Sequence, residues 1–193
     1  MSSFKEVDLP GIPEHIEPSW SISIKKLTSI ADVEDAASCT SGREVKITPV
    51  KWASWLDSEH SPIREFKLAV TCTGMSYFTS VHFVRHKIGV EHYVRSHRED
   101  RAGVPRSLED LVTHRMSLNA ASLIAIMRKR LCGKAAEDTR AWALRIKAAM
   151  SKHPDEYVRI LAEFLRPECD YRGHCPEFKS CGRYPSKEHS NGL

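Results

Sequence analysis

The spacing of apolar residues changes near Pro105, and this change constrains the fold more than any other feature of the sequence. Before Pro105, short runs either alternate apolar and polar residues or are rich in β-branched and aromatic residues, which is typical of strands. Strands are predicted over residues 22–27, 66–72, 77–84 and 90–97. The second and third of these form a predicted hairpin around Gly74, and a short helix is predicted over residues 31–39.

After Pro105, apolar residues recur at the spacing of an α-helix. Ser107 is followed by acidic residues, as an N-cap would be, and Gly133 ends the pattern, so one long helix is predicted from residue 108 to 131. Two more helices are predicted over residues 135–151 and 155–165, and the Pro- and Gly-rich tail 167–193 is predicted to be a loop. The chain of 193 residues is therefore divided into an extended arm (1–20), one domain (21–166) and the tail.

Composition argues against several classes of protein. No apolar run approaches the roughly 20 residues that span a bilayer, and the N-terminus resembles no secretory signal. We therefore expect a cytoplasmic protein, not bound to membranes, whose cysteines are reduced. A net charge of +4 is weak support for any partner, and nucleic acid is not expected as one.

Basic and hydroxyl side chains are concentrated in residues 85–98. Ser96 and Arg98 are two residues apart in an extended run, so their side chains face the same side. A hydroxyl beside a guanidinium is suited to binding a phosphate. An exposed edge strand that carries charges against aggregation would show the same pattern, so both interpretations stay open here.

The same residues resemble the signature of the flavin-dependent thymidylate synthases, Arg-His-Arg-x-x-Ser followed closely by Ser-x-Arg. The matching residues are Arg85, His86, Lys87, Ser96 and Arg98. The family's helical signature is matched, at the same spacings, by Asn119, Ala121, Ser122, Arg130, Ala135, Ala136, Asp138 and Arg140. Three residues depart from the family's pattern and leave the exact substrate open: Glu65, Val90 and Ala121.

The resemblance implies an α+β fold, with a small, mainly antiparallel sheet and helices packed beside it. It implies a homotetramer whose active sites lie between subunits. It also implies transfer of a one-carbon unit from methylenetetrahydrofolate to C5 of a pyrimidine deoxynucleotide monophosphate, converting deoxyuridylate to thymidylate, with FAD as the cofactor and NADPH as the reductant. In such an enzyme the protein mainly binds and orients the reactants.

The resemblance also implies roles for individual residues. The FAD would be held by Arg85, His86, Lys87, Asn119 and Arg130. The nucleotide would be held by Ser96, Arg98, Ser122 and Arg140. Ser96 and Arg140 are the candidate catalytic residues, with Ser96 positioning the substrate and not attacking it.

Spacing alone gives a second argument for the helical residues. Asn119, Ser122, Ile126 and Arg130 are three or four residues apart, so they form one stripe along a helix. The stripe would face a ligand or a subunit interface, or it would be the solvated face of an amphipathic helix.

Three cysteines of the tail are spaced six residues apart: Cys169, Cys175 and Cys181. Together with a fourth ligand they could bind zinc or an iron–sulfur cluster. Cys132 is the preferred fourth ligand, because His174 adjoins Cys175 and adjacent side chains converge on one ion only with strain. Free thiols in a substrate lid are the alternative, and the two remaining cysteines, Cys39 and Cys72, are expected in the core.

Two other functions stay open. A related enzyme would hydroxymethylate the pyrimidine, because the same folate adduct gives that product when it is hydrolysed and not reduced. A non-enzymatic nucleic-acid-binding module would use the basic strand and a metal-bound tail. The enzyme should be yellow when purified, whereas the binding module should be colourless.

Overall fold

A four-stranded antiparallel sheet in the order β1-β2-β4-β3 is the centre of the protein. The computed structural model describes residues 20–96, 98 and 107–186, so the predicted arm lies, but for residue 20, outside the described residues. The strands are β1 (Ser21–Lys26), β2 (Lys67–Ser76), β3 (Val90–Val94) and β4 (Leu111–Asn119). The fold is α+β, in agreement with what the resemblance implied.

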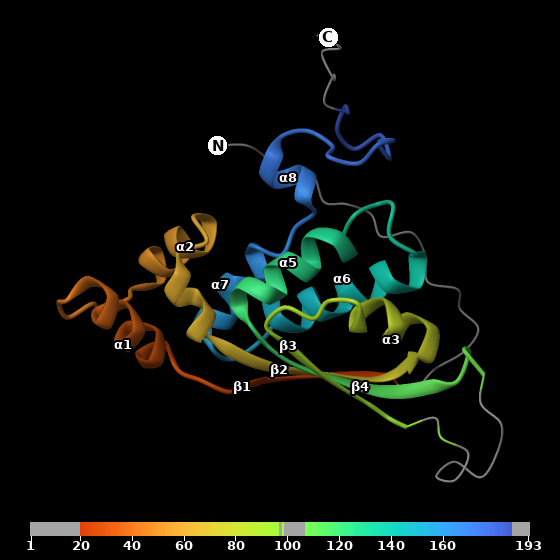
Figure 1. Ribbon diagram of the computed structural model, residues 1–193, viewed down its shortest axis with the longest axis horizontal. Helices are drawn as coiled ribbons and strands as arrows, with labels where there is room; N and C mark the ends of the chain where they lie inside the picture. The colour runs from red at the N-terminus through yellow and green to blue at the C-terminus, as the bar shows by residue number, and fades with distance from the viewer. Residues whose placement is uncertain (1–19, 97, 99–106, 187–193) are drawn as a thin grey trace.

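The helices lie together on one side of the sheet (Figure 1). They are α1 (Ile30–Ser41), α2 (Pro49–Asp57), the short 3-10 helix η1 (Ser61–Glu65), α3 (Tyr77–Val84), α5 (Ala120–Arg130), α6 (Glu137–Ser151), α7 (Glu156–Glu163) and α8 (Glu168–Arg172). The core lies between the sheet and this layer, and includes the fully buried Val70 and Leu123. The other face of the sheet is largely polar, with pairs such as Thr71 opposite Arg115. None of the helices described is long and apolar enough to cross a membrane.

The hairpin predicted around Gly74 is wrong. Strand β2 continues through residues 73–76, with a shift in register at Gly74 (φ 80°), and residues 77–84 then form helix α3. The Ser76 hydroxyl accepts a hydrogen bond from the Thr79 N–H (3.2 Å) and so caps the helix. The backbone N–H of Tyr77 donates to a neighbouring loop, at the Asp110 carbonyl (2.8 Å), so tertiary contacts override the β propensity of this run.

The single long helix predicted for residues 108–131 is also wrong in its first half. Residues 111–119 form strand β4, whose alternate side chains are buried, and only α5 is helical. Asn119 marks the change, because its side-chain oxygen accepts a hydrogen bond from the Ser122 N–H (2.9 Å) and caps α5.

The remaining predicted elements are close to their predicted positions, apart from the tail, but the sequence did not predict α2 or η1. The predicted strands at 22–27, 66–72 and 90–97, and the helices at 31–39, 135–151 and 155–165, correspond to β1, β2, β3, α1, α6 and α7. The tail is not only a loop, because it contains α8. Cys72 is buried as expected, but Cys39 is exposed, so its placement in the core was wrong.

Candidate functional site

The loop between α3 and β3, residues 85–89, carries the basic residues of the first signature. They follow a helix and not the strand that the sequence predicted. Arg85 and Lys87 are exposed, and His86 is half-buried. The loop therefore presents two exposed cations and one half-buried imidazole.

Two residues of the helical signature fix this loop in place. The Ser122 hydroxyl donates to the Ile88 carbonyl (3.0 Å), which ties the loop to the first turn of α5. Gly89 has φ +66°, and a Cβ atom there would lie 2.4 Å from the Ser122 oxygen and 3.0 Å from the side-chain nitrogen of Asn119. The oxygens of Asn119 and Ser122 thus bond to protein groups, so the polar stripe of α5 faces the loop.

Arg130, in the last turn of α5, brings a further cation to the same place. Its Nη2 donates to the His82 carbonyl in α3 (2.5 Å), and the His82 ring bonds to the Thr139 hydroxyl of α6 (2.9 Å). Burial and the charge of Arg85 lower the pKa of Arg130. Among the described residues, neither Arg85 nor Arg130 has a carboxylate partner, which leaves an excess of positive charge here.

A chain of histidines lies beneath the loop. The His92 Nε2–H donates to the His86 carbonyl (2.7 Å), and the other ring nitrogen of His92 lies 3.0 Å from Nε2 of His114. Burial and nearby charges, chiefly that of Arg130, lower the pKa of His86 to about 4. Burial, with a smaller contribution from His92, lowers the pKa of His114 to about 4. Both rings are therefore neutral at neutral pH.

Sequence reasoning missed several of these residues: His82, His92, His114 and Thr139. For His114 a signal was present. Val112, His114, Met116 and Leu118 alternate along one face, and this period of two indicates a strand with a buried histidine.

Of the predicted nucleotide residues, Ser122 contacts the loop of the flavin residues, whereas the other three lie apart from that loop. The backbone N–H of Arg98 donates to the Ser96 hydroxyl (3.3 Å), and both follow the end of β3, near the pairing of Arg95 with Thr113. This is the end of β3 farther from Gly89. Arg140 lies elsewhere, half-buried in the first turn of α6.

Unpartnered polar atoms indicate that the basic cluster can accept a ligand. The basic cluster consists of Arg85, His86 and Arg130. Within it, the buried Nε2 of His86 and Nε of Arg130 have no hydrogen-bond partner in the described structure. Buried polar groups are normally satisfied, so such atoms call for a partner. Two guanidinium groups and an imidazole fit an anionic cofactor such as FAD, whose pyrophosphate is bound well by Arg.

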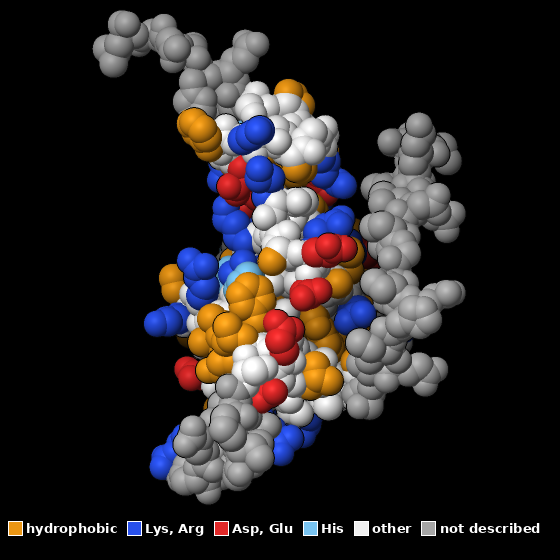
Figure 2. Space-filling view, turned by 90° about the vertical axis from the view of Figure 1, so that its right-hand side faces the viewer, with side chains coloured by type: hydrophobic (Ala, Val, Ile, Leu, Met, Phe, Trp, Pro, Cys, Tyr) orange, Lys and Arg blue, Asp and Glu red, His pale blue; other side chains and the backbone are white. Residues whose placement is uncertain are grey.

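Apolar side chains are exposed beside the basic cluster. Phe78 and Val81 of α3 are exposed, and so are Leu108 and Leu111 of the segment 107–111. The two segments adjoin, because the Phe78 N–H donates to the Leu108 carbonyl (2.9 Å). Figure 2 shows apolar side chains gathered on this side of the molecule, next to a histidine and basic side chains.

A separate pocket lies at the far end of α5, where the tail folds back. All four predicted metal ligands line it: Cys132, Cys169, Cys175 and Cys181. His174 does not line it and bonds instead to the Arg172 carbonyl (2.9 Å). Burial raises the pKa of the Cys169 thiol, and the charges of Asp170 and Cys132 raise it further. Within the described residues, no group of three His, Cys, Asp or Glu side chains is arranged to hold one metal ion.

Comparison with known proteins gives a likeness of fold. No protein-family model matches the sequence, and no curated protein matches it. Among solved structures, the UMP/dUMP methylase PolB from Streptomyces cacaoi, bound with 5-Br dUMP, is similar with a TM-score of 0.55. The match covers 76% of this chain and 97% of that chain at 13% sequence identity, so it supports a common fold and nothing finer.

Proposed function

We propose that this protein is an FAD-dependent enzyme that transfers a one-carbon unit from methylenetetrahydrofolate to C5 of a pyrimidine deoxynucleotide monophosphate, with NADPH as reductant. One observation carries the proposal. Arg85, His86 and Arg130 match two signatures far apart in the sequence and lie close together in the structure. His86 and Arg130 have buried nitrogens without a hydrogen-bond partner, and the fold is similar to that of a UMP/dUMP methylase.

Each residue of the cluster has a definite part in binding. Arg85 and Arg130 would pair with the phosphates of the cofactor, Arg85 from the surface and Arg130 from a half-buried position. His86 is neutral at physiological pH, so its Nε2 can form a hydrogen bond to an uncharged ligand atom without adding charge. When bound, the flavin supplies the hydride that the one-carbon transfer needs.

The nucleotide would bind through Ser96, Arg98 and Arg140, with the Ser96 hydroxyl and the Arg98 guanidinium on its phosphate. Ser122, which was predicted to bind the nucleotide, bonds to the Ile88 carbonyl and so positions the loop of residues 85–89, which carries the proposed flavin residues. Lys87, which was predicted to bind FAD, is exposed to solvent. Asn119 has the same supporting role as Ser122, because it caps α5 beneath Gly89.

A homotetramer would complete the active site. Ser96 and Arg98 lie beyond the end of β3 that is farther from Gly89, so the two halves of the site would meet only across a subunit interface. The exposed Phe78 and Val81 next to the basic cluster support this, because apolar patches rimmed by polar residues commonly mark interfaces.

The absorption spectrum of the purified protein is the first test. We expect a flavin spectrum, or uptake of added FAD, and conversion of deoxyuridylate in the presence of methylenetetrahydrofolate and NADPH. Mass spectrometry of the nucleotide separates a methyl product from a hydroxymethyl product and also tests deoxycytidylate as the substrate. A protein that takes up no FAD, binds neither nucleotide and binds DNA or RNA would contradict the proposal in favour of a nucleic-acid-binding module.

A further inference from the structure

The C-terminal lobe, residues 167–186, folds without an apolar core of its own. Its only buried side chains among the described residues are Cys169 and Cys175. Its largest apolar side chain, Phe178, is fully exposed. Ordering a segment of this length costs conformational entropy, and short segments that bury little apolar surface usually depend on disulfides or metals.

Polar contacts join different parts of the lobe to each other. Asp170 of α8 receives two parallel hydrogen bonds from Arg183, both 2.9 Å long, which close the lobe on itself. The backbone N–H of Cys175 donates to the Pro185 carbonyl (2.9 Å). These contacts are largely exposed, and exposed ion pairs contribute little to stability.

Other contacts join the lobe to the rest of the protein. The ring of Tyr171 lies between Arg128 of α5 (4.1 Å) and Arg166 (4.3 Å), and Glu168 pairs with Arg128 at 3.7 Å. Lys129 of α5 pairs with Glu177 at 3.5 Å. The lobe is therefore held against the C-terminal end of α5, beyond which Cys132 lies (Figure 1).

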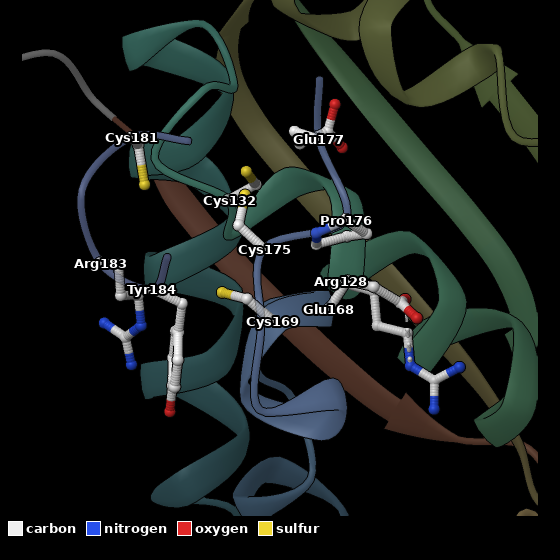
Figure 3. Close-up of a pocket in the computed structure, with 10 residues that line it drawn as sticks. All are labelled: Arg128, Cys132, Glu168, Cys169, Cys175, Pro176, Glu177, Cys181, Arg183 and Tyr184. Atoms are coloured by element: carbon white, nitrogen blue, oxygen red, sulfur yellow. Dashed lines mark ion pairs between the residues drawn. The ribbon is translucent and has the colours of Figure 1, made fainter. Parts of the chain in front are cut away.

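Four cysteines surround the space between this helix end and the lobe. Figure 3 shows the side chains of Cys132, Cys169 and Cys175 around one pocket, with Cys181 on a loop at its other side. Gly133 permits this approach, because a Cβ atom there would lie 3.1 Å from the Cys181 sulfur. All four are free thiols. Such convergence of cysteines from distant parts of the sequence is typical of a metal centre.

Two kinds of metal centre are held by four thiolates, and they differ in how far apart their sulfur atoms lie. Zinc held by four thiolates requires sulfur atoms about 3.8 Å apart, since each Zn–S bond is about 2.3 Å long. Among the described residues, no group of three His, Cys, Asp or Glu side chains is placed to hold a single metal ion. In a [4Fe–4S] cluster each thiolate binds a different iron, so its sulfur ligands stand farther apart around a larger space.

Groups that can interact with the sulfur ligands surround the pocket. Arg128 and Arg183 line it together with Glu168 and Glu177, and the backbone N–H of Lys134 points to the Cys132 sulfur at 3.5 Å. Hydrogen bonds to the sulfur ligands and nearby cations stabilise iron–sulfur centres and adjust their potentials.

We infer that Cys132, Cys169, Cys175 and Cys181 bind a [4Fe–4S] cluster that fastens the C-terminal lobe to the end of α5. The cluster has a structural role in this proposal, and it is independent of flavin binding. The pocket lies at the tail, whereas the basic cluster lies beside the loop of residues 85–89.

Anaerobic purification of the full chain without an affinity tag tests this inference. We expect about four iron and four acid-labile sulfide per chain, and a brown colour that remains when flavin has been removed. Electron paramagnetic resonance after reduction should give the signal of a [4Fe–4S] centre. Stoichiometric zinc, two iron per chain, or no metal with all four thiols readily alkylated would each overturn the assignment.

Matched cysteine variants separate this site from adventitious iron. Cys175→Ser combined with Cys181→Ser should lose most of the iron and sulfide, whereas Cys39→Ser on the exposed face of α1 should keep both. The tail contains no Trp, so the fluorescence of the buried Trp52 and Trp142 reports whether the domain remains folded. The double variant should also become sensitive to trypsin at Lys179. Full iron content in the double variant would refute the inference.

Discussion

Arg85 and His86 can be replaced with little damage to the fold, because one is exposed and the other is half-buried without a partner for Nε2. We predict that Arg85→Ala combined with His86→Ala yields a folded, colourless protein. Loss of one charge-assisted hydrogen bond costs roughly 1.5–3 kcal/mol, or about ten- to a hundredfold in affinity. Flavin content after gel filtration measures the effect.

The control for this double variant is Arg43→Ala, which removes an exposed arginine beyond the end of α1. It should keep the wild-type flavin content. Full flavin content in the Arg85 and His86 variant would remove these residues from the proposed site, whatever the activity.

His114 should make stability depend on pH. It is fully buried, and its pKa is about 4 in the folded protein against a usual value of 6.5. The unfolded chain therefore takes up a proton between these values while the folded protein does not, so stability falls as pH decreases from 6.5 to 4. The loss attributable to His114 is on the order of 3 kcal/mol.

Urea denaturation at pH 7 and near pH 4 measures this loss. His114→Gln should lose less stability than the wild type over that interval, although it starts lower because His92 loses a partner. His60→Gln, at an exposed position, should keep the wild-type dependence. An equal loss in His114→Gln and wild type would show that the buried ring does not cause the effect.

At the scale of elements, the loop of residues 85–89 depends on its contact with α5. Gly89→Ala places a methyl group 2.4 Å from the Ser122 oxygen at φ +66°, and so combines backbone strain with a clash. We expect a loss of about 2–4 kcal/mol and weaker flavin binding. Thermal unfolding and flavin titration measure both effects.

Gly42→Ala separates the two causes. Gly42 has nearly the same backbone angle (φ +67°), but nothing lies within 4 Å of a Cβ atom there. It should lose only about 1 kcal/mol, from strain alone, and should keep flavin binding. Equal effects of the two substitutions would mean that the contact between the loop and α5 does not matter.

The errors in predicting elements from the sequence have a common physical cause. In residues 77–84 the β-branched and aromatic side chains favour a strand, yet these residues form a helix. The backbone N–H groups of Tyr77 and Phe78 donate to the carbonyls of residues 110 and 108, which anchors the start of this helix. In residues 107–119 a period of two, carried by Val112, His114, Met116 and Leu118, overlaps apolar spacings that also fit a helix. Both outcomes depend on partners distant in the sequence, which a local pattern does not contain.

The candidate sites were predictable to different extents. The cysteine spacing and the adjacent helix end sufficed to identify four residues that line one pocket. The two signatures found Arg85, His86 and Arg130, but not His92 or His114, because neither signature contains these positions. Local spacing also could not show that Ser122 bonds to the protein backbone, since its partner, the Ile88 carbonyl, is 34 residues away.

At the scale of the whole molecule, α5 connects the two sites. Arg130 in its last turn reaches the His82 carbonyl beside the basic cluster, and Cys132 two residues later lines the cysteine pocket. The lobe itself lies away from the sheet, beyond the C-terminal end of α5 (Figure 1), so one helix carries residues of two separate sites.

The apolar patch beside the basic cluster gives a prediction for assembly. Phe78 is 44% exposed on α3, and a glutamate there would place an uncompensated charge in any interface that covers the patch. We expect the wild type to be a tetramer by analytical ultracentrifugation, and Phe78→Glu to dissociate and to lose activity because its two half-sites no longer meet. The control is Val50→Glu on α2, a different helix, where the valine is 81% exposed. It should leave the tetramer and the activity unchanged. A wild-type protein that is monomeric at micromolar concentration yet fully active would contradict the shared site, because one chain would then have to bring Ser96 to Arg85 without a partner.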